Sequence, residues 1–169
     1  AFFRFLEAER GSITIDGIDI ASIALATLRQ RLTIIPQDAQ LFGGTIRSNL
    51  DPFGVYDDGD MWFALKRCRL AISGDCPGST APHSPVQSLD DIVEQNGANL
   101  SAGQRQLLAL ARGLLKMRDS RLLLLDESTA NLDTESDAFI QRTLREQMSP
   151  GTTLLTVAHR LRTIIDYDR

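Results

Sequence analysis

The feature that most constrains the fold is a continuously apolar run, Leu122 to Leu125, that ends in two adjacent carboxylates, Asp126 and Glu127. An unbroken apolar run of this length is typical of a strand that is buried on both faces of a parallel sheet. Parallel strands need long crossover connections, which are usually helices, so the run predicts an α/β fold. In such folds ligands bind beyond the carboxyl ends of the strands, where Asp126 and Glu127 are expected to lie.

Other segments supply the elements that such a fold needs. Residues 12–20 alternate polar and apolar side chains around Asp16-Gly17, which predicts a hairpin. The further expected elements are a strand at 32–35 that stops at Pro36, a helix after Asp57 and Asp58, a helix from Ser101, a helix from Thr134, and a strand at 152–158. The order strand, helix, strand after residue 121 predicts a right-handed parallel crossover.

The helix expected to begin at Ser101 is favourable for anion binding. Ser101 and Gln104 fit a capping box, with Ser at the N-cap and Gln three residues later. Ala102 and Gly103 have little side chain, so a phosphate can approach the unpaired backbone N–H groups closely. The same pattern also occurs in helices that only need a cap, so by itself it leaves both interpretations open.

Composition excludes several classes of protein. The 169 residues, 43% hydrophobic and 24% charged, are typical of one globular domain. A net charge of −4 without a Lys/Arg-rich run argues against a nucleic-acid surface. The apolar stretch 107–115 is interrupted by Arg112 and falls short of the ~20 residues of a membrane helix, so we expect no direct membrane insertion of this segment. Cys68 and Cys76 match no zinc spacing and are expected to be free thiols.

The paired carboxylates suit phosphoryl chemistry. Asp126 can hold Mg²⁺, directly or through water, and Mg²⁺ neutralises phosphate charge during transfer. Glu127 can orient or deprotonate an attacking water. The alternative is a solvated strand end followed by a helix cap. A nucleotide hydrolase also needs a Gly-rich phosphate loop with a Lys, and no such loop occurs in these 169 residues.

Five motifs, in the same order along the chain, resemble those of ATP-binding cassette (ABC) proteins. They are Gln37 in Ile-Pro-Gln-Asp (Q-loop), Leu100-Ser101-Ala102-Gly103-Gln104 (signature motif), Leu122–Asp126 followed by Glu127 (Walker B strand and catalytic glutamate), Ala130-Asn131-Leu132-Asp133 (D-loop), and His159 in Thr-Val-Ala-His-Arg (switch histidine). The signature motif is usually Leu-Ser-Gly-Gly-Gln. Ala102 therefore replaces a glycine, which slightly restricts the backbone.

The resemblance implies a role for each matched residue. The implied catalytic residues are Glu127, His159 and Gln37, the implied Mg²⁺ ligands are Asp126 and Gln37, and the implied ATP-binding residues are Ser101, Ala102, Gly103, Gln104 and Asp133. His159 would contact the γ-phosphate. Ser101 and Gly103 would bind the ATP of a partner domain, so that one chain contributes to two sites.

Residues 41–53 narrow the resemblance to the second nucleotide-binding domain of C-type, multidrug-resistance-associated exporters, and the Asp-Glu pair fits that half. The implied fold is a RecA-like P-loop NTPase core with a parallel sheet, a small antiparallel N-terminal sheet and a helical signature subdomain. We expect residues 1–169 to be a partial domain, with the helical subdomain at about 55–115 and a mobile loop at 73–87 that is long for the type. Walker A is expected before Ala1, residues 1–6 resemble the end of the helix that follows it, and closing strands are expected after Arg169.

The resemblance implies an ATPase that uses ATP and Mg²⁺ to power export of organic anions or conjugates. Its partners would be a second nucleotide-binding domain, paired head to tail, and the transmembrane domains of the same transporter, at the cytoplasmic face of a membrane and without nucleic acid. The 169-residue chain alone is expected to be inactive. Two alternatives stay open, a soluble ABC ATPase without a membrane partner and a non-catalytic truncated remnant.

Overall fold

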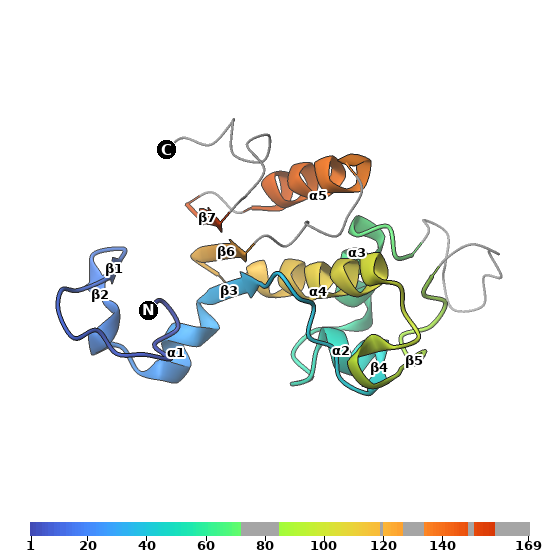
Figure 1. Ribbon diagram of the computed structural model, residues 1–169, viewed down its shortest axis with the longest axis horizontal. Coiled ribbons are helices and arrows are strands. Elements are labelled where there is room, and N and C mark those ends of the chain that lie inside the picture. Colours follow the sequence, from blue (N-terminus) through green and yellow to red (C-terminus); the bar gives the residue numbers. More distant parts are fainter. Residues whose placement is uncertain (72–84, 119, 127–133, 149–150, 158–169) are drawn as a thin grey trace.

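The computed structural model describes residues 1–71, 85–118, 120–126, 134–148 and 151–157 (Figure 1). The elements are β1 (Thr14–Ile15), β2 (Ile18–Asp19), the 3-10 helix η1 (Ile20–Ser22), α1 (Leu25–Gln30), β3 (Leu32–Ile35), β4 (Gly44–Thr45), α2 (Ile46–Leu50), α3 (Asp58–Arg67), β5 (Ile92–Val93), the 3-10 helix η2 (Gln95–Gly97), α4 (Ala102–Met117), β6 (Leu122–Asp126), α5 (Thr134–Gln147) and β7 (Thr153–Val157). The loop expected to be mobile at 73–87 lies outside the described residues except for 85–87.

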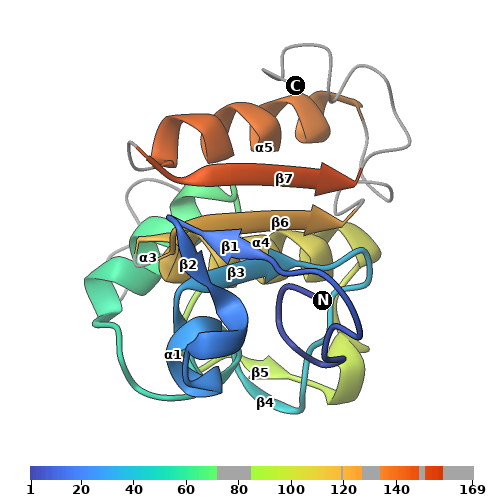
Figure 2. The same ribbon diagram turned by 90° about the vertical axis from the view of Figure 1, so that its left-hand side faces the viewer.

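The central sheet is parallel and has the order β3-β6-β7. In its register Ile35 lies opposite Leu125, and Asp126 lies opposite Val157. The apolar run 122–125 thus forms the middle strand of the described sheet, which explains why it is apolar on both sides. The α/β class with a parallel sheet is confirmed. In both views α5 lies alongside β7 (Figures 1 and 2).

The two faces of the sheet are covered by different parts of the chain. Residues 123 and 125 of β6 belong to the large core, together with buried side chains of α3, α4 and α5. Leu122 instead packs in a smaller cluster with Ile20, Leu28 and Leu32 from the N-terminal part. In Figure 1 the strands lie between the N-terminal hairpin, at the left, and helices α4 and α5, at the right. The cover of the second face is incomplete, because Ile34 of β3 remains 46% exposed.

The expected hairpin at 12–20 is confirmed as the antiparallel pair β1-β2. Its turn residues Asp16 and Gly17 have φ values of 51° and 77°, in the left-handed region. Two such residues define a type I′ turn, whose twist matches that of the flanking strands. Residues 1–6, expected to end a helix, form a turn closed by a hydrogen bond from the Arg4 N–H to the Ala1 carbonyl. Six residues are too few for a stable helix without a preceding helical turn.

Helix α4 packs directly on β3 through a glycine. A Cβ added to Gly113 would lie 2.7 Å from Cγ1 and 2.8 Å from Cδ1 of Ile35, whose side chain is fully buried. No side chain larger than hydrogen fits at this crossing unless the Ile35 side chain, the strand or the helix moves. Gly113 therefore sets how closely α4 approaches the sheet.

Replacing Gly113 by alanine should destabilise the chain. Alanine favours the helix by about 1 kcal/mol, but overpacking a buried contact costs about 1–3 kcal/mol, so we expect the free energy of unfolding to fall by up to about 2 kcal/mol. Gly59→Ala in α3 is the matched control, because the Cβ there would meet only the Asp57 side chain, at 3.2 Å. Urea unfolding should show Gly59→Ala unchanged or more stable. Equal stabilisation by both variants would contradict the close contact at Gly113.

Candidate nucleotide site

Two of the predicted site residues lie at one edge of the sheet. Ile35 and Leu125 are paired at the carboxyl ends of β3 and β6, so Pro36 is level with Asp126 and Gln37 follows one residue later. Both Gln37 and Asp126 are exposed to solvent. The structure thus brings a carboxylate and a carboxamide to the edge where α/β folds bind ligands. Glu127 and Asp133, which follow β6 in the sequence, and His159, which follows β7, lie outside the described residues.

The side chains at this edge fit a magnesium ion that also binds a phosphate. Mg²⁺ is commonly held by one or two carboxylates together with substrate phosphate oxygens and water, and less often by a cage of protein ligands. Within the described ranges no three His, Cys, Asp or Glu side chains gather into such a cage. Asp126, at the end of β6, and Gln37, two residues after the end of β3, could both contribute oxygen ligands to such an ion.

The helix N-terminus at Ser101 has the predicted capping box. The Gln104 N–H donates to Ser101 Oγ at 3.1 Å, and the Ser101 N–H donates to Gln104 Oε1 at 2.8 Å. Ser101 and Ala102 are exposed, and the first turn of α4 contains no acidic residue. The positive end of the helix dipole is therefore open to an anion, and the Ser101 hydroxyl proton remains available to donate to one.

Helix α4 runs antiparallel to β3, which sets where Ser101 lies. Near its beginning Gln106 donates to the Pro36 carbonyl at 3.3 Å, and near its end Lys116 donates to the Arg29 carbonyl at 3.0 Å. Ser101 precedes Gln106 by five residues, or roughly 7.5 Å along the helix axis. The helix therefore carries the signature residues past the edge of the sheet, beyond the end of β3 (Figure 1). The sheet-edge residues, Gln37 and Asp126, and the signature residues at the start of α4 are therefore separated along the axis of that helix.

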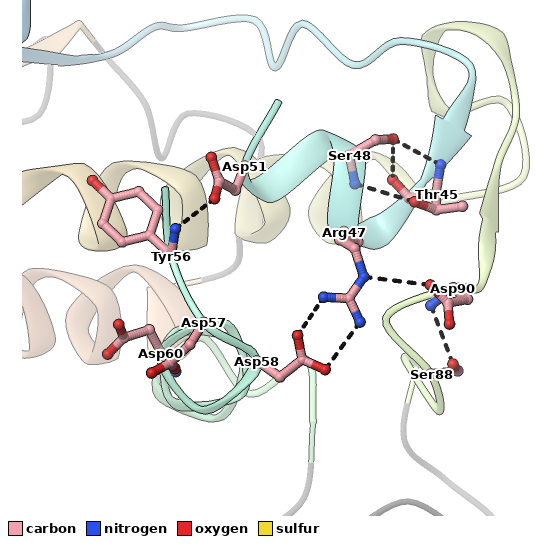
Figure 3. A network of polar contacts seen from close by, with 10 residues as sticks. All are labelled: Thr45, Arg47, Ser48, Asp51, Tyr56, Asp57, Asp58, Asp60, Ser88 and Asp90. Atoms are coloured by element: carbon pink, nitrogen blue, oxygen red, sulfur yellow. Dashed lines mark hydrogen bonds and ion pairs between the residues drawn. The ribbon is translucent and has the colours of Figure 1, made fainter. Parts of the chain in front are cut away.

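A polar network fixes the connector that carried the subfamily resemblance (Figure 3). Arg47 of α2 donates to both carboxylate oxygens of Asp58, at the start of α3, and pairs with Asp90 at 3.4 Å. The hydrogen bonds from Arg47 lower the pKa of the Asp58 carboxyl. Buried Asp51 accepts from the Tyr56 N–H at 2.7 Å. Because these bonds join three segments, α2 is held in place relative to α3 and to the turn before β5.

Three polar residues that bond backbone groups after β3 were not predicted as site residues from the sequence. They are Asn49 and Gln106, which are buried, and Arg112, which is half-buried. Asn49 accepts from the Phe42 N–H at 3.2 Å and donates to the Phe42 carbonyl at 2.9 Å, so its side chain replaces a strand partner for that residue. A signal did exist for Gln106, because it begins the helical stripe that continues with buried Leu110, Gly113 and Met117.

Comparison with known proteins identifies the family of the chain. Residues 1–130 match the family described as ABC transporter. The chain is 48% identical over 180 residues to the "Pleiotropic ABC efflux transporter of multiple drugs YBT1" of Candida glabrata, covering 100% of the chain and 11% of that protein. It is 52% identical over 167 residues to "ATP-binding cassette sub-family C member 3" of Homo sapiens, covering 99% of the chain and 10% of that protein.

A solved structure matches the fold over nearly the whole chain. It is described as "Structure of a bacterial Atm1-family ABC exporter with ATP bound", with a TM-score of 0.81 and 36% identity over 98% of this chain and 27% of that one. The chain spans about a tenth of the length of the curated relatives it matches. In the ranges that the structure describes, no helix combines the length and the apolar character needed to cross a membrane. This chain belongs to the ABC transporter family, with relatives of the C type, and matches the nucleotide-binding domain of an ABC exporter.

Proposed function

We propose that these residues serve as the ATP-hydrolysing motor of a C-type exporter. The observation that carries the proposal is the meeting of Gln37 and Asp126 at the carboxyl edge of β3 and β6. Asp126 and Gln37 would hold Mg²⁺, and Glu127 would orient or deprotonate the attacking water. His159, two residues after β7 in the sequence, would contact the γ-phosphate.

The signature residues serve a different nucleotide in this proposal. Ser101, Ala102, Gly103 and Gln104 lie at the open start of α4, beyond the edge that carries Asp126. An anion there would be bound by backbone N–H groups and the helix dipole. We propose that this anion is the γ-phosphate of ATP held by a second nucleotide-binding domain, paired head to tail, and that Asp133 contributes to the same interface.

The whole protein would be an integral membrane transporter with this domain at its cytoplasmic face. A relative of the chain is named for efflux of multiple drugs, and another for ATP-dependent permeation of bile acid. These names support export of organic anions or conjugates, powered through transmembrane domains of the same protein. The helical subdomain at about 55–115 would contain α3 and most of α4.

The 169-residue chain alone should neither bind ATP tightly nor hydrolyse it. The backbone N–H groups and lysine of a Gly-rich loop supply most of the binding energy for the phosphates, and the sequence contains no such motif. Calorimetric titration with MgATP checks this. Micromolar binding together with turnover above background would contradict it.

In the full-length protein Glu127→Gln should keep ATP binding and slow hydrolysis by about 10²–10⁴, because it removes the group that activates water. The variant should accumulate closed, ATP-bound domain pairs. Glu146→Gln, on the exposed side of α5, is the control and should hydrolyse ATP like the parent. If turnover of Glu127→Gln stays within about threefold of the parent, Glu127 is not the catalytic carboxylate.

Gly103→Asp distinguishes a phosphate-binding helix start from a merely capped one. The new carboxylate would stand where a phosphate must bind, so we expect folding and ATP binding by each domain to persist while ATP-driven pairing is lost. Ser101→Ala should cost about 1 kcal/mol of stability through the lost cap and should also weaken pairing. Melting temperature, nucleotide binding and domain pairing are compared for both variants. Normal pairing by Gly103→Asp would reject the role in trans.

A further inference from the structure

The signature turn is reached through a short segment of irregular backbone. Residues 94–100, which we call the approach segment, connect β5 to the N-cap of α4 and contain only the 3-10 helix η2. Asn96 and Gly97 have φ values of 57° and 66°, in the left-handed region. Irregular backbone has many accessible conformations, and each would present Ser101 and the first turn of α4 differently. The contacts that select one conformation therefore decide how the signature turn is presented.

The side chain of Asn99 bonds the end of the approach segment to β5 and to the segment's own beginning. Asn99 Nδ2 donates to the Ile92 carbonyl at 2.8 Å, and Asn99 Oδ1 accepts from the Glu94 N–H at 3.0 Å. A carboxamide supplies both the donor and the acceptor, whereas an aspartate would keep the acceptor and lose the donor. Ile92 is paired with Thr45, the N-cap of α2, so Asn99 is fixed relative to that helix.

Arg105 holds the approach segment from the helix. Its Nη1 donates to the Leu100 carbonyl at 2.7 Å and to the Gly97 carbonyl at 3.4 Å. The stem of the side chain packs on Gly97, since a Cβ added there would lie 2.8 Å from Cδ and 3.0 Å from Cγ of Arg105. The glycine thus leaves room for the arginine stem, and the guanidinium bonds the residue that directly precedes the N-cap.

The charges at the start of α4 are opposite to those that stabilise a free helix. Acidic side chains are favourable in the first turn of a helix, and cations are unfavourable there. The first turn of α4 contains no acidic residue, and Arg105 lies at its end. The helix dipole therefore does not explain this arginine, whereas the two carbonyl groups that it bonds do. Its charge also favours an anion at the N–H groups of Ala102 and Gly103.

We propose that Asn99 and Arg105 are positioning residues that preform the signature turn for the phosphate of the partner domain's ATP. The proposal rests on the proposed function and deepens it. With both side chains bonded, the N–H groups of Ala102 and Gly103 are held in place before the phosphate arrives. Without these bonds the approach segment has to be ordered during pairing, and the cost of ordering lowers the affinity of the two domains. Asn99 and Arg105 act through the backbone groups that they bond.

The test measures domain pairing in the full-length transporter, with a spin label on each nucleotide-binding domain and a non-hydrolysable ATP analogue. Asn99→Ala removes both bonds of the carboxamide. We expect the analogue concentration for half-maximal pairing to rise about 10-fold, because the lost preorganisation weakens pairing. Arg105→Met keeps the stem beside Gly97, removes the donor and should raise this concentration in the same way. Binding of the analogue to unpaired domains, measured with Gly103→Asp added, should change less than about twofold.

Ser88→Ala is the matched control. It removes a side-chain acceptor from the segment that leads into β5, where Ser88 Oγ accepts from the Asp90 N–H at 3.1 Å (Figure 3). Its melting temperature should fall about as much as that of Asn99→Ala, while its pairing equals that of the parent. The loss in Arg105→Met, relative to the parent, should persist at about 0.5 M salt, because salt screens an effect of the guanidinium charge on the anion.

The outcomes separate this inference from the proposed function. Normal pairing by Gly103→Asp would remove the role of the signature turn in trans, and this inference with it. Lost pairing by Gly103→Asp together with parent-like pairing by Asn99→Ala and Arg105→Met would overturn the positioning role alone. So would an equal loss in Ser88→Ala, which would be a general effect of stability, or a loss confined to Arg105→Met that disappears at high salt. If Asn99→Ala fails to fold, Arg105→Met decides by the same criteria.

Discussion

The crossing of α4 over β3 is the contact on which the rest of the molecule depends. At Gly113 the helix leaves no room for a Cβ beside the Ile35 side chain, so glycine permits this close approach. From this crossing the helix extends in one direction to Lys116, bonded to Arg29, and in the other to Gln106, bonded to Pro36. Each end of β3 is therefore placed relative to a single rigid rod. The signature turn lies at the end of that rod, so its distance from the strand edge follows from the crossing.

Irregular backbone close to the crossing explains why the interior contains polar side chains. Between β3 and β4 the chain runs for eight residues without a helix or a strand, and its carbonyl groups need donors. Asn49, Gln106 and Arg112 supply them at Pro36, Gln40 and Phe42. Leucine in their place would pack well but would remove these donors. The polar interior is thus the consequence of placing an irregular, functional loop against a helix.

The sequence predicted the parts of the fold that local patterns determine. The hairpin at Asp16-Gly17, the strands at 32–35 and 122–125 and the capping box at Ser101 all depend on neighbouring residues, and all are confirmed. The meeting of Gln37 and Asp126 could also be expected, because parallel strands end at a common edge. The attachments of Gln106 and Arg112 could not. Gln106 is 70 residues from Pro36, and Arg112 is 72 residues from Gln40, so which carbonyl each one meets depends on the tertiary packing. The roles assigned to Glu127, Asp133 and His159 stay predictions, since they lie outside the described residues.

The separation of the two groups of site residues has a physical consequence for how such a domain works. Gln37 and Asp126 lie at the sheet edge, whereas Ser101 projects past that edge on α4. A triphosphate is too short to be bound at both places by one chain if the helix start faces away from its own edge. In the proposed function a second domain satisfies both, since a head-to-tail pair would bring the signature turn of each to the sheet edge of the other. Closure of such a pair would then depend, in the proposed function, on two nucleotides at once.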